Sequence, residues 1–202
     1  MQTTAARFAP AAARNREPIL AVLRRVLPAQ GTVLEIASGT GEHAVHCAGH
    51  LPHLVWQPTD IDPDALASIA AHRGAAGLPN LRPPLALDVT APDWSVAQAH
   101  AVVCINMIHI APWAAAEGLM AGAGRLLAPG STLYLYGPFK EDGRHTAPSN
   151  AAFDASLRAL DPAWGVRDAG AVCDLAARHG FAFVERVAMP ANNLSLVFRR
   201  SP

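Results

Sequence analysis

A short segment near residue 40 combines one acid in an apolar run with two closely spaced glycines. The residues from Val33 to His43 read VLEIASGTGEH, in which Glu35 lies inside the apolar run and Gly39 and Gly41 follow it. An acid inside a buried strand is unfavourable unless a polar group meets it, and glycine lets the main chain turn sharply and approach a ligand closely. The segment therefore predicts a buried strand, a tight nucleoside-binding turn and the start of a helix.

Polar residues also follow the next predicted strands. Asp60 comes 21 positions after Gly39, close to the spacing of about 20 residues expected for an acid that binds a ribose. Asp88, together with the backbone amide of Val89, could pair with the amino group and ring nitrogen of adenine. Because ligands of doubly wound sheets bind outside the carboxyl ends of the strands, we expect these residues and Asn106 to share one exposed rim.

Two cofactors compete for this turn. The stretch from Gly39 to Ala44 also satisfies the dinucleotide pattern G-x-G-x-x-G/A. Glu35, Asp88 and a predicted C-terminal hairpin favour S-adenosylmethionine (SAM) over NAD(P), and a purely structural turn is the third possibility. The residues expected to contact SAM, or its product S-adenosylhomocysteine (SAH), are Glu35, Ala37, Ser38, Gly39, Gly41, Asp60, Ile61, Asp88, Val89, Asn106 and Met107.

Apolar periodicity and turn residues indicate strands that alternate with helices. Strands are predicted at 32–37, 54–59, 85–87, 101–106, 131–136, 181–188 and 194–199, and helices at 18–27, 41–50, 64–73, 113–127, 151–160 and 170–179. Only residues 189–193 separate the last two strands, which is too short for a crossover helix, so these strands should pair antiparallel. The prediction is an α/β, Rossmann-like fold: a seven-stranded, mostly parallel sheet that ends in an antiparallel hairpin, with helices on both faces.

Several longer strings extend beyond the glycine turn. They are RNREPIL (14–20), LEIASGTGEH (34–43), QPTDID (57–62), NMIHIAPW (106–113), YGPF (136–139), SN (149–150), WGVRD (164–168) and MPANNL (189–194). On these strings the chain resembles the class I SAM-dependent methyltransferases, and within them a group of unknown function related to methyltransferase-like protein 26. The resemblance implies the class I methyltransferase fold and SAM binding. It implies no particular acceptor, because the group is defined by sequence more firmly than by reaction.

The residues after the fourth predicted strand often line the methyl-transfer site of this fold. Here, Asn106-Met107-Ile108-His109 lacks the Asn/Asp-Pro-Pro-Tyr/Phe signature of amino-group methylation, which disfavours nucleobase and glutamine acceptors. His109 could act as a general base, because the ordinary pKa of histidine lies near neutrality. Alternatively, it packs beside Trp113 and bonds a backbone carbonyl. We expect methyl transfer to a small molecule or a protein side chain; the other classes are a non-catalytic SAM sensor and an NAD(P)-dependent oxidoreductase.

Candidate acceptor-binding residues lie in separate segments. Asn15 and Arg16 precede the first predicted helix, where they could contact the acceptor from a lid or cap the helix. Four further candidates are Tyr136, Phe139, Asn192 and Asn193. The last two also fit a plain hairpin turn. The polar segment 140–150 is expected to be a loop, either a lid or a solvated connection.

Three histidines and one cysteine recur on one face of a predicted helix. They are His43, His46, Cys47 and His50. Adjacent helical turns can supply two zinc ligands, but no cluster elsewhere in the sequence completes a tetrahedral set. We therefore predict packing and capping roles for these residues and no bound metal.

The 202 residues are expected to form one domain, with a helical lid segment at 1–30 and a core at 31–202. Apolar residues make up 51% of the chain, and 16 basic residues balance 16 acidic ones. This neutral balance predicts no nucleic-acid or membrane partner. Three scattered cysteines indicate a reducing compartment, and we expect a cytoplasmic location because neither a spanning helix nor a secretion signal is recognised. The oligomeric state is left open.

Overall fold

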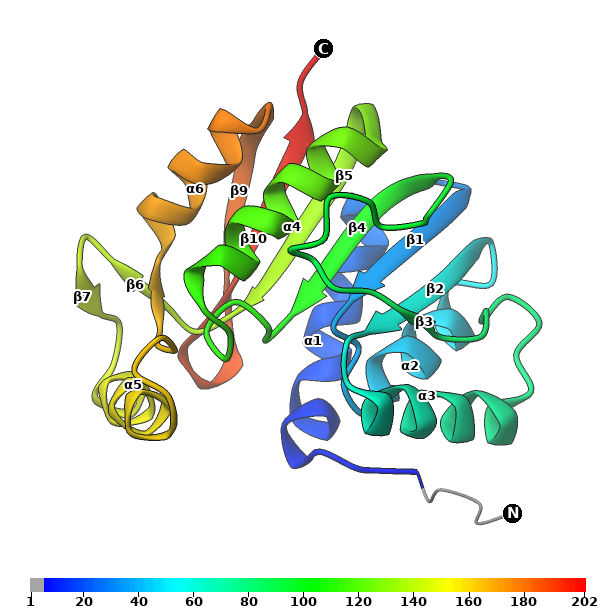
Figure 1. The fold of residues 1–202 in the computed structure, drawn as a ribbon, viewed down its shortest axis with the longest axis horizontal. Coiled ribbons are helices and arrows are strands. Elements are labelled where there is room, and N and C mark those ends of the chain that lie inside the picture. Colours follow the sequence, from blue (N-terminus) through cyan, green and yellow to red (C-terminus); the bar gives the residue numbers. More distant parts are fainter. Residues whose placement is uncertain (1–5) are drawn as a thin grey trace.

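The computed structural model describes residues 6–202 and is built around a seven-stranded sheet (Figure 1). Its strands are β1 (Gly31–Ile36), β2 (Leu54–Asp60), β3 (Leu85–Ala86), β4 (Ala99–Ile105), β5 (Leu127–Gly137), β9 (Phe181–Met189) and β10 (Asn193–Arg200). They lie in the order β3-β2-β1-β4-β5-β10-β9. β10 runs opposite to the other six strands and pairs antiparallel with both β5 and β9. The predicted mostly parallel sheet with a closing hairpin is therefore confirmed.

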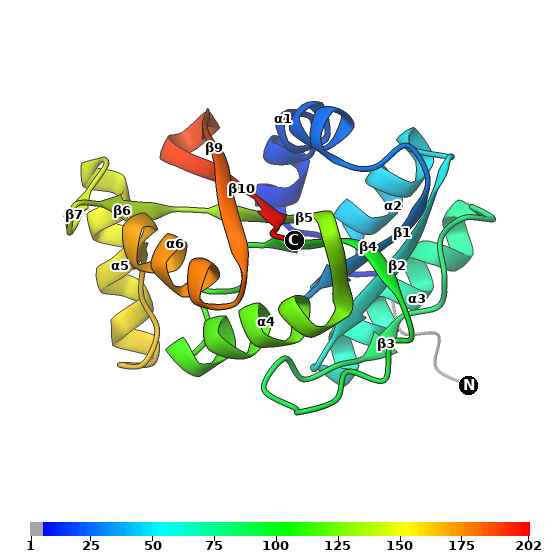
Figure 2. The ribbon, with the colours of Figure 1, turned by 90° about the horizontal axis from the view of Figure 1, so that it is seen from above.

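Helices cover both faces of this sheet (Figure 2). They are α1 (Pro10–Val26), α2 (Glu42–His50), α3 (Pro63–Ala76), α4 (Trp113–Leu126), α5 (Pro148–Leu160) and α6 (Ala169–Arg178). The apolar residues of α1 and α2 share one core cluster with the sheet, and those of α4 and α6 share the other. α3 packs beside α2 and β2, so the sheet is buried between two layers as the sequence predicts.

Alternate residues of β1 pack to opposite faces, as the two-residue period of a strand requires. Val33 belongs to the cluster under α1 and α2, whereas Leu34 and Ile36 belong to the cluster under α4. Because β1 pairs in parallel with β2 and β4, and β4 pairs in parallel with β5, all four strands end at one edge of the sheet. That edge carries the loops that follow Ile36 and Asp60.

The first helix begins eight residues earlier than predicted, at Pro10 instead of Pro18. Alanine and arginine are strong helix formers, and Pro10 is tolerated in the first turn because the amide it lacks has no partner there. Pro18 lies inside the helix instead of opening it. Asn15 and Arg16 are therefore interior helix residues, and the expectation that they precede or cap the helix is wrong.

The segment 140–150 is not a simple loop. It forms a hairpin of β6 (Phe139–Glu141) and β7 (Arg144–His145), and β6 also pairs with β8 (Arg167–Asp168). Asp142 and Gly143 both have positive φ, 51° and 74°, as the two-residue turn Asp-Gly favours. The prediction of a loop is therefore wrong. The Asp-Gly pair in the sequence is typical of a hairpin turn and could have indicated it. β5 likewise begins four residues earlier than predicted, at Leu127.

Two glycines of α4 let this helix approach the segment that follows β3. A side chain at Gly118 would collide with the backbone carbonyl of Val89, and one at Gly122 would collide with the ring of Trp94. Trp94 is buried and donates a hydrogen bond of 3.3 Å to the Val89 carbonyl. The two glycines therefore fix the position of the residues around Asp88 against the sheet.

We predict that Gly118→Ala lowers the free energy of unfolding by about 1–3 kcal/mol, because an added methyl group would press on backbone that cannot move independently. Gly74→Ala in α3 is the matched control, since a side chain there meets no atom within 4 Å. It should raise stability by about 0.5–1 kcal/mol through helix propensity alone. Urea unfolding followed by circular dichroism measures both variants, and equal effects of the two substitutions would contradict this account.

Candidate functional site

Three cavities follow one another along the carboxyl edge of the sheet. The first, of about 360 Å³, lies at Asp88, and the second, of about 460 Å³, lies at the glycine turn. Both are lined by Ala37, Ile61, Met107, Ile110 and Ala111. The third, of about 470 Å³, shares Ala11, Asn106 and Ile110 with the second. Shared walls make the three cavities neighbours, with Ile110 bordering all of them.

The turn after β1 has an unusual backbone. Ala37, Gly39 and Gly41 have φ values of 54°, 57° and 92°, in the left-handed region that alanine seldom adopts. A side chain at Gly39 would meet nothing within 4 Å, so the second cavity reaches the main chain there. A side chain at Gly41 would lie 2.9 Å from the Cα atom of Ile69. Gly39 thus faces the cavity, whereas Gly41, which was also expected to contact the cofactor, lets α3 pack against the turn.

Hydrogen bonds tie this turn to β2. The amide of Ser38 donates to the Thr59 carbonyl at 2.8 Å, and the amide of Thr59 donates to the Ser38 hydroxyl at 3.2 Å. The Thr59 hydroxyl donates to the Glu35 carbonyl at 2.8 Å. These buried bonds hold the second cavity open at the place where β1 and β2 end.

Asp60 is buried, with 7% of its surface exposed, so the expectation of an exposed position is wrong for this residue. Its carboxylate accepts hydrogen bonds from the amides of Gly39, at 2.8 Å, and Asp62, at 3.0 Å. Asp60 also lines the second cavity. One side chain therefore both shapes the turn and presents a carboxylate to a ligand.

Because Asp60 has this structural role, Asp60→Ala should lower the free energy of unfolding by about 2–4 kcal/mol, since two amides lose a charged acceptor. The matched control is Asp62→Ala. Asp62 is half-exposed and caps α3 by accepting from the Asp64 amide at 3.0 Å, so its loss should cost about 1 kcal/mol. Chemical unfolding compares the two variants. An Asp60→Ala protein as stable as the Asp62→Ala protein would refute the structural role.

Glu35 is almost fully buried and lines the second cavity. The indole nitrogen of Trp56 donates a hydrogen bond of 2.7 Å to its carboxylate. Burial raises the pKa of Glu35 from 4.5 to about 7, although the bond from Trp56 acts in the opposite direction. The polar partner that a buried acid requires is therefore the indole N–H of Trp56, a residue that the sequence analysis did not single out.

The raised pKa of Glu35 predicts a specific pH dependence of stability. The unfolded chain loses this proton near pH 4.5, whereas the folded chain keeps it until about pH 7. The associated stability is thus fully present below pH 4.5 and is lost as pH rises to 7 and above, by on the order of 3 kcal/mol. Glu35→Gln lacks this titration. Between pH 4.5 and 8 the unfolding free energy of the wild-type protein should fall by that amount relative to that of Glu35→Gln, and parallel profiles would contradict the assignment.

The first cavity combines one carboxylate with apolar walls. Asp88 is exposed and accepts from the hydroxyl and amide of Thr90, at 2.7 and 2.8 Å, and these bonds lower its pKa. The walls include Leu87, Val89 and Trp164. Trp164, which comes from the loop after α5, was not predicted. A flat apolar ring with a hydrogen-bonding edge fits this combination.

The segment before α1 covers part of the second cavity. The amide of Ala9 donates to the Glu42 carboxylate at 2.6 Å, and the amide of Arg7 donates to the Ser68 hydroxyl at 2.8 Å. Ser68 in turn donates to the Thr40 carbonyl at 2.8 Å. These contacts fasten residues 7–12 across the glycine turn, in the region where the sequence predicts a lid.

The third cavity contains His109, which is 97% buried because only 3% of its surface is exposed. Its Nδ1 atom has no hydrogen-bond partner among residues 6–202. Burial lowers the pKa of His109 to about 4, and the nearby charge of Arg167 acts in the same direction. The ring packs edge-on against Phe153, with centroids 5.7 Å apart. The ring of His109 therefore packs against Phe153 and not against Trp113, which was the expected neighbour. Its imidazole is neutral and lies beside the cavity.

Only some of the remaining candidates for acceptor binding lie at the third cavity. Asn15, Asn192 and Asn193 line the third cavity, and Asn15 is buried and accepts a 2.8 Å hydrogen bond from His43. Phe139 is buried completely in the core cluster under α4 and α6, and Arg16 is exposed outside the cavity, so the expectation is wrong for both. Tyr136 is buried and does not line the cavity; its hydroxyl has no partner among residues 6–202.

Residues that the sequence analysis missed complete the third cavity. They are Arg14, Ser149, Asn150 and Phe153, together with the apolar residues Ala11 and Pro138. Arg14 was missed because only the helical spacing from Pro10 onward shows that it, and not Arg16, reaches the cavity. Ser149 and Asn150 stood in one of the quoted strings, but no argument from chemistry singled them out.

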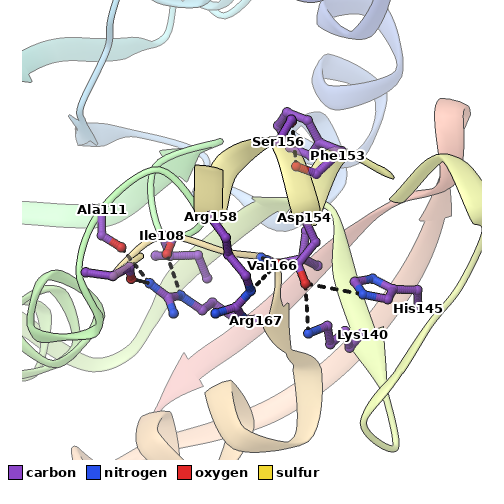
Figure 3. A network of polar contacts seen from close by, with 11 residues as sticks. Ile108, Ala111, Lys140, His145, Phe153, Asp154, Ser156, Arg158, Val166 and Arg167 are labelled. Carbon is purple, nitrogen blue, oxygen red and sulfur yellow. Dashed lines mark hydrogen bonds and ion pairs between the residues drawn. The ribbon is translucent and has the colours of Figure 1, made fainter. Parts of the chain in front are cut away.

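An ion-pair network holds α5 beside this cavity (Figure 3). The buried carboxylate of Asp154 lies 3.1 Å from Lys140 Nζ, and 3.3 Å from His145 Nε2 and from Arg158 Nε. It also accepts from the Val166 amide at 2.7 Å. Burial raises the pKa of Asp154, but these partners outweigh it and lower the pKa on balance. The network therefore fixes Asn150 and Phe153, on the same helix, at the cavity.

Hydrogen bonds from Arg167 hold the loop after β4 in place. Arg167 donates to the carbonyls of Ile108 and Ala111, at 3.0 and 2.6 Å (Figure 3). Asn106, at the start of the loop, has a positive φ of 61°, a conformation that asparagine tolerates better than most residues. These contacts place the loop between the second and third cavities.

The histidines of α2 have protein partners. His43 bonds Asn15, and His50 Nδ1 lies 2.8 Å from the His46 carbonyl. His46 Nε2 lies 3.3 Å from the Glu17 carboxylate but forms no hydrogen bond among residues 6–202. Within residues 6–202 there is no group of three or more His, Cys, Asp or Glu side chains placed to hold a metal ion. Over the same residues, no helix has both the length and the hydropathy needed to cross a membrane.

Comparison with known proteins gives the family of this chain and solved structures that share its fold. Residues 6–200 match the sequence profile of a family described as a protein of unknown function (DUF938), and the chain belongs to that family. The chain has a methyltransferase fold. It is similar to an O-methyltransferase family protein from Burkholderia thailandensis, with a TM-score of 0.81 and 18% identity over 95% of this chain and 57% of that one.

Two further solved structures show the same fold. The mitomycin 7-O-methyltransferase MmcR has a TM-score of 0.80 and 14% identity, over 95% of this chain and 54% of that one. CalO1, a methyltransferase of calicheamicin biosynthesis in an SAH-bound form, has a TM-score of 0.75 and 16% identity over the same shares, 95% and 54%. The chain thus spans little more than half the length of these proteins. At such identities the likeness establishes the fold, and the chemistry must be argued from the site.

Proposed function

We propose that the chain is a SAM-dependent methyltransferase that transfers a methyl group to a small-molecule or protein acceptor. The observation that carries the proposal is the order of acids along the first two cavities. Asp88 borders the first cavity, and Asp60 and Glu35 border the second. This order suits an adenine at Asp88, a ribose at Asp60 and a positively charged methionine half near Glu35.

The residues present fit such a cofactor. The open space over Gly39 admits a ligand against the main chain, and Asp60 is fixed by two amides before any ligand binds. The wall residues Ala37, Ile61 and Met107 extend through both cavities. SAM supplies an electrophilic methyl group on a sulfonium. The protein orients the reacting groups and excludes water.

Glu35 also argues against the dinucleotide alternative. A pyrophosphate over the glycine turn would lie in the same cavity as this buried carboxyl, whose pKa of about 7 leaves it only partly ionised at neutral pH, and the anion would oppose its ionisation further. A cationic sulfonium or ammonium group would be attracted to it instead. The position of Glu35 in the second cavity thus supports SAM over NAD(P).

The proposal extends to the relationship with methyltransferase-like protein 26 that the quoted strings suggest, and to a cytoplasmic location. The free cysteines Cys47, Cys104 and Cys173 are consistent with a reducing compartment. His109 is proposed as the group that accepts a proton from the acceptor, because its imidazole is neutral and lines the third cavity. No nucleic acid, membrane or metal has a part in the proposal.

Isothermal titration calorimetry with SAM, SAH and NAD(H) tests the proposal. The folded protein should bind SAM and SAH with dissociation constants well below about 1 mM, as expected for an enzyme cofactor, and should show no heat with NAD(H). Binding of NAD(H) alone, or no binding of SAM and SAH, would refute it. Binding of SAM without methylation of any small molecule or protein would favour the sensor alternative.

A further inference from the structure

The third cavity is rich in amide groups and contains no acid. Five of its lining residues are asparagines: Asn15, Asn106, Asn150, Asn192 and Asn193. The side chain of Asn150 donates to the Asn192 carbonyl at 2.9 Å, and that of Asn192 donates to the Ser149 hydroxyl at 3.3 Å. These bonds fix part of the wall across α5 and the β9–β10 connection. Neither Asp nor Glu lines the cavity.

Arg14 gives the cavity its charge. It is exposed on α1 and lines the cavity, and among residues 6–202 it forms no ion pair. His109 adds no positive charge, because burial keeps its imidazole neutral. A cationic group here would lose water without meeting a counter-charge, which is strongly unfavourable. The cavity therefore disfavours protonated amines, including lysine and arginine side chains.

The size of the cavity limits the acceptor in a second way. Its volume of about 470 Å³ falls within the range of roughly 300–1,000 Å³ that holds one small organic molecule. Apolar contacts are available from Ile110 and Phe153, which are 44% and 40% exposed. A compact molecule with an apolar body and polar ends thus matches the walls better than a peptide segment.

On the basis of the proposed function, we propose that the third cavity binds a small anionic molecule whose free hydroxyl group is the methyl acceptor. Arg14 holds the negative group, and the asparagine amides hold neutral oxygens. The acceptor hydroxyl gives its proton to the imidazole of His109, which lines the cavity. Its oxygen forms a bond to the methyl carbon while the carbon–sulfur bond breaks, and the electron pair of that bond stays on sulfur. The products are a methyl ether and SAH, and His109 returns its proton to water.

A labelling experiment separates this acceptor class from others. The protein is incubated with SAM that carries a trideuterated methyl group and with small-molecule extract from cells that express it. The extract is divided beforehand by ion exchange into anionic, neutral and cationic fractions, and a protein fraction is added. Mass spectrometry should find label in the anionic fraction, in a product whose methyl group resists mild alkali, as an ether does and an ester does not.

A matched pair of variants tests the role of Arg14. Arg14→Glu reverses the charge at the cavity, and Arg24→Glu makes the same change at an exposed position on the same helix, away from it. Arg14→Glu should lower the labelled product by about tenfold or more, and Arg24→Glu should leave it within about twofold. Equilibrium dialysis with SAH-loaded protein should show the same loss of retained anions for Arg14→Glu, independently of turnover.

Label in the neutral, cationic or protein fraction, label released by alkali, equal effects of the two variants, or no label despite intact SAM binding would each overturn the inference. Calorimetry on the same samples shows which claim has failed. If the wild-type protein does not bind SAM, the proposed function itself is wrong.

Discussion

The buried carboxylate of Asp60 is the contact on which the candidate site depends. It accepts from the amides of Gly39 and Asp62, so it joins the turn after β1 to the start of α3. Since the carboxylate is shielded from water, these two amides provide much of the stabilisation that water would give it. The bonds between Ser38 and Thr59 support the same junction. The cavity wall therefore forms only when both strand ends are in place.

Charge is distributed unevenly along the three cavities, and this distribution gives them separate roles. The acids Asp88, Asp60 and Glu35 border the first two cavities, and the Arg7 that also lines the second is paired with Asp62 at 3.6 Å, whereas Arg14 is the charged residue that lines the third. Asn106 borders the second and third cavities. A cationic ligand and an anionic ligand would thus be drawn to adjacent cavities, with their reacting groups near this residue. Complementary charge of this kind guides ligands and selects among them.

Much of the fold and of the lining of the first two cavities can be predicted from the sequence, because the residues involved lie next to strand ends. The lining of the third cavity cannot be predicted as well. The early start of α1 changes which of its residues reach the cavity, so Arg14 lines it and Arg16 does not. Phe139 lies beside the predicted strand end but points into the core. Phe153 reaches His109 only because ion pairs at Asp154 position α5, and such long-range contacts leave no local pattern.

A crystal structure of the chain with SAH would test the central claim, that this edge of the sheet is a SAM site. The predicted result is an adenine ring in the first cavity beside Asp88 and Val89, ribose hydroxyls within hydrogen-bonding distance of Asp60, and a sulfur atom directed toward the third cavity near Asn106. SAH bound away from the glycine turn, or bound there with its ribose out of reach of Asp60, would contradict the account.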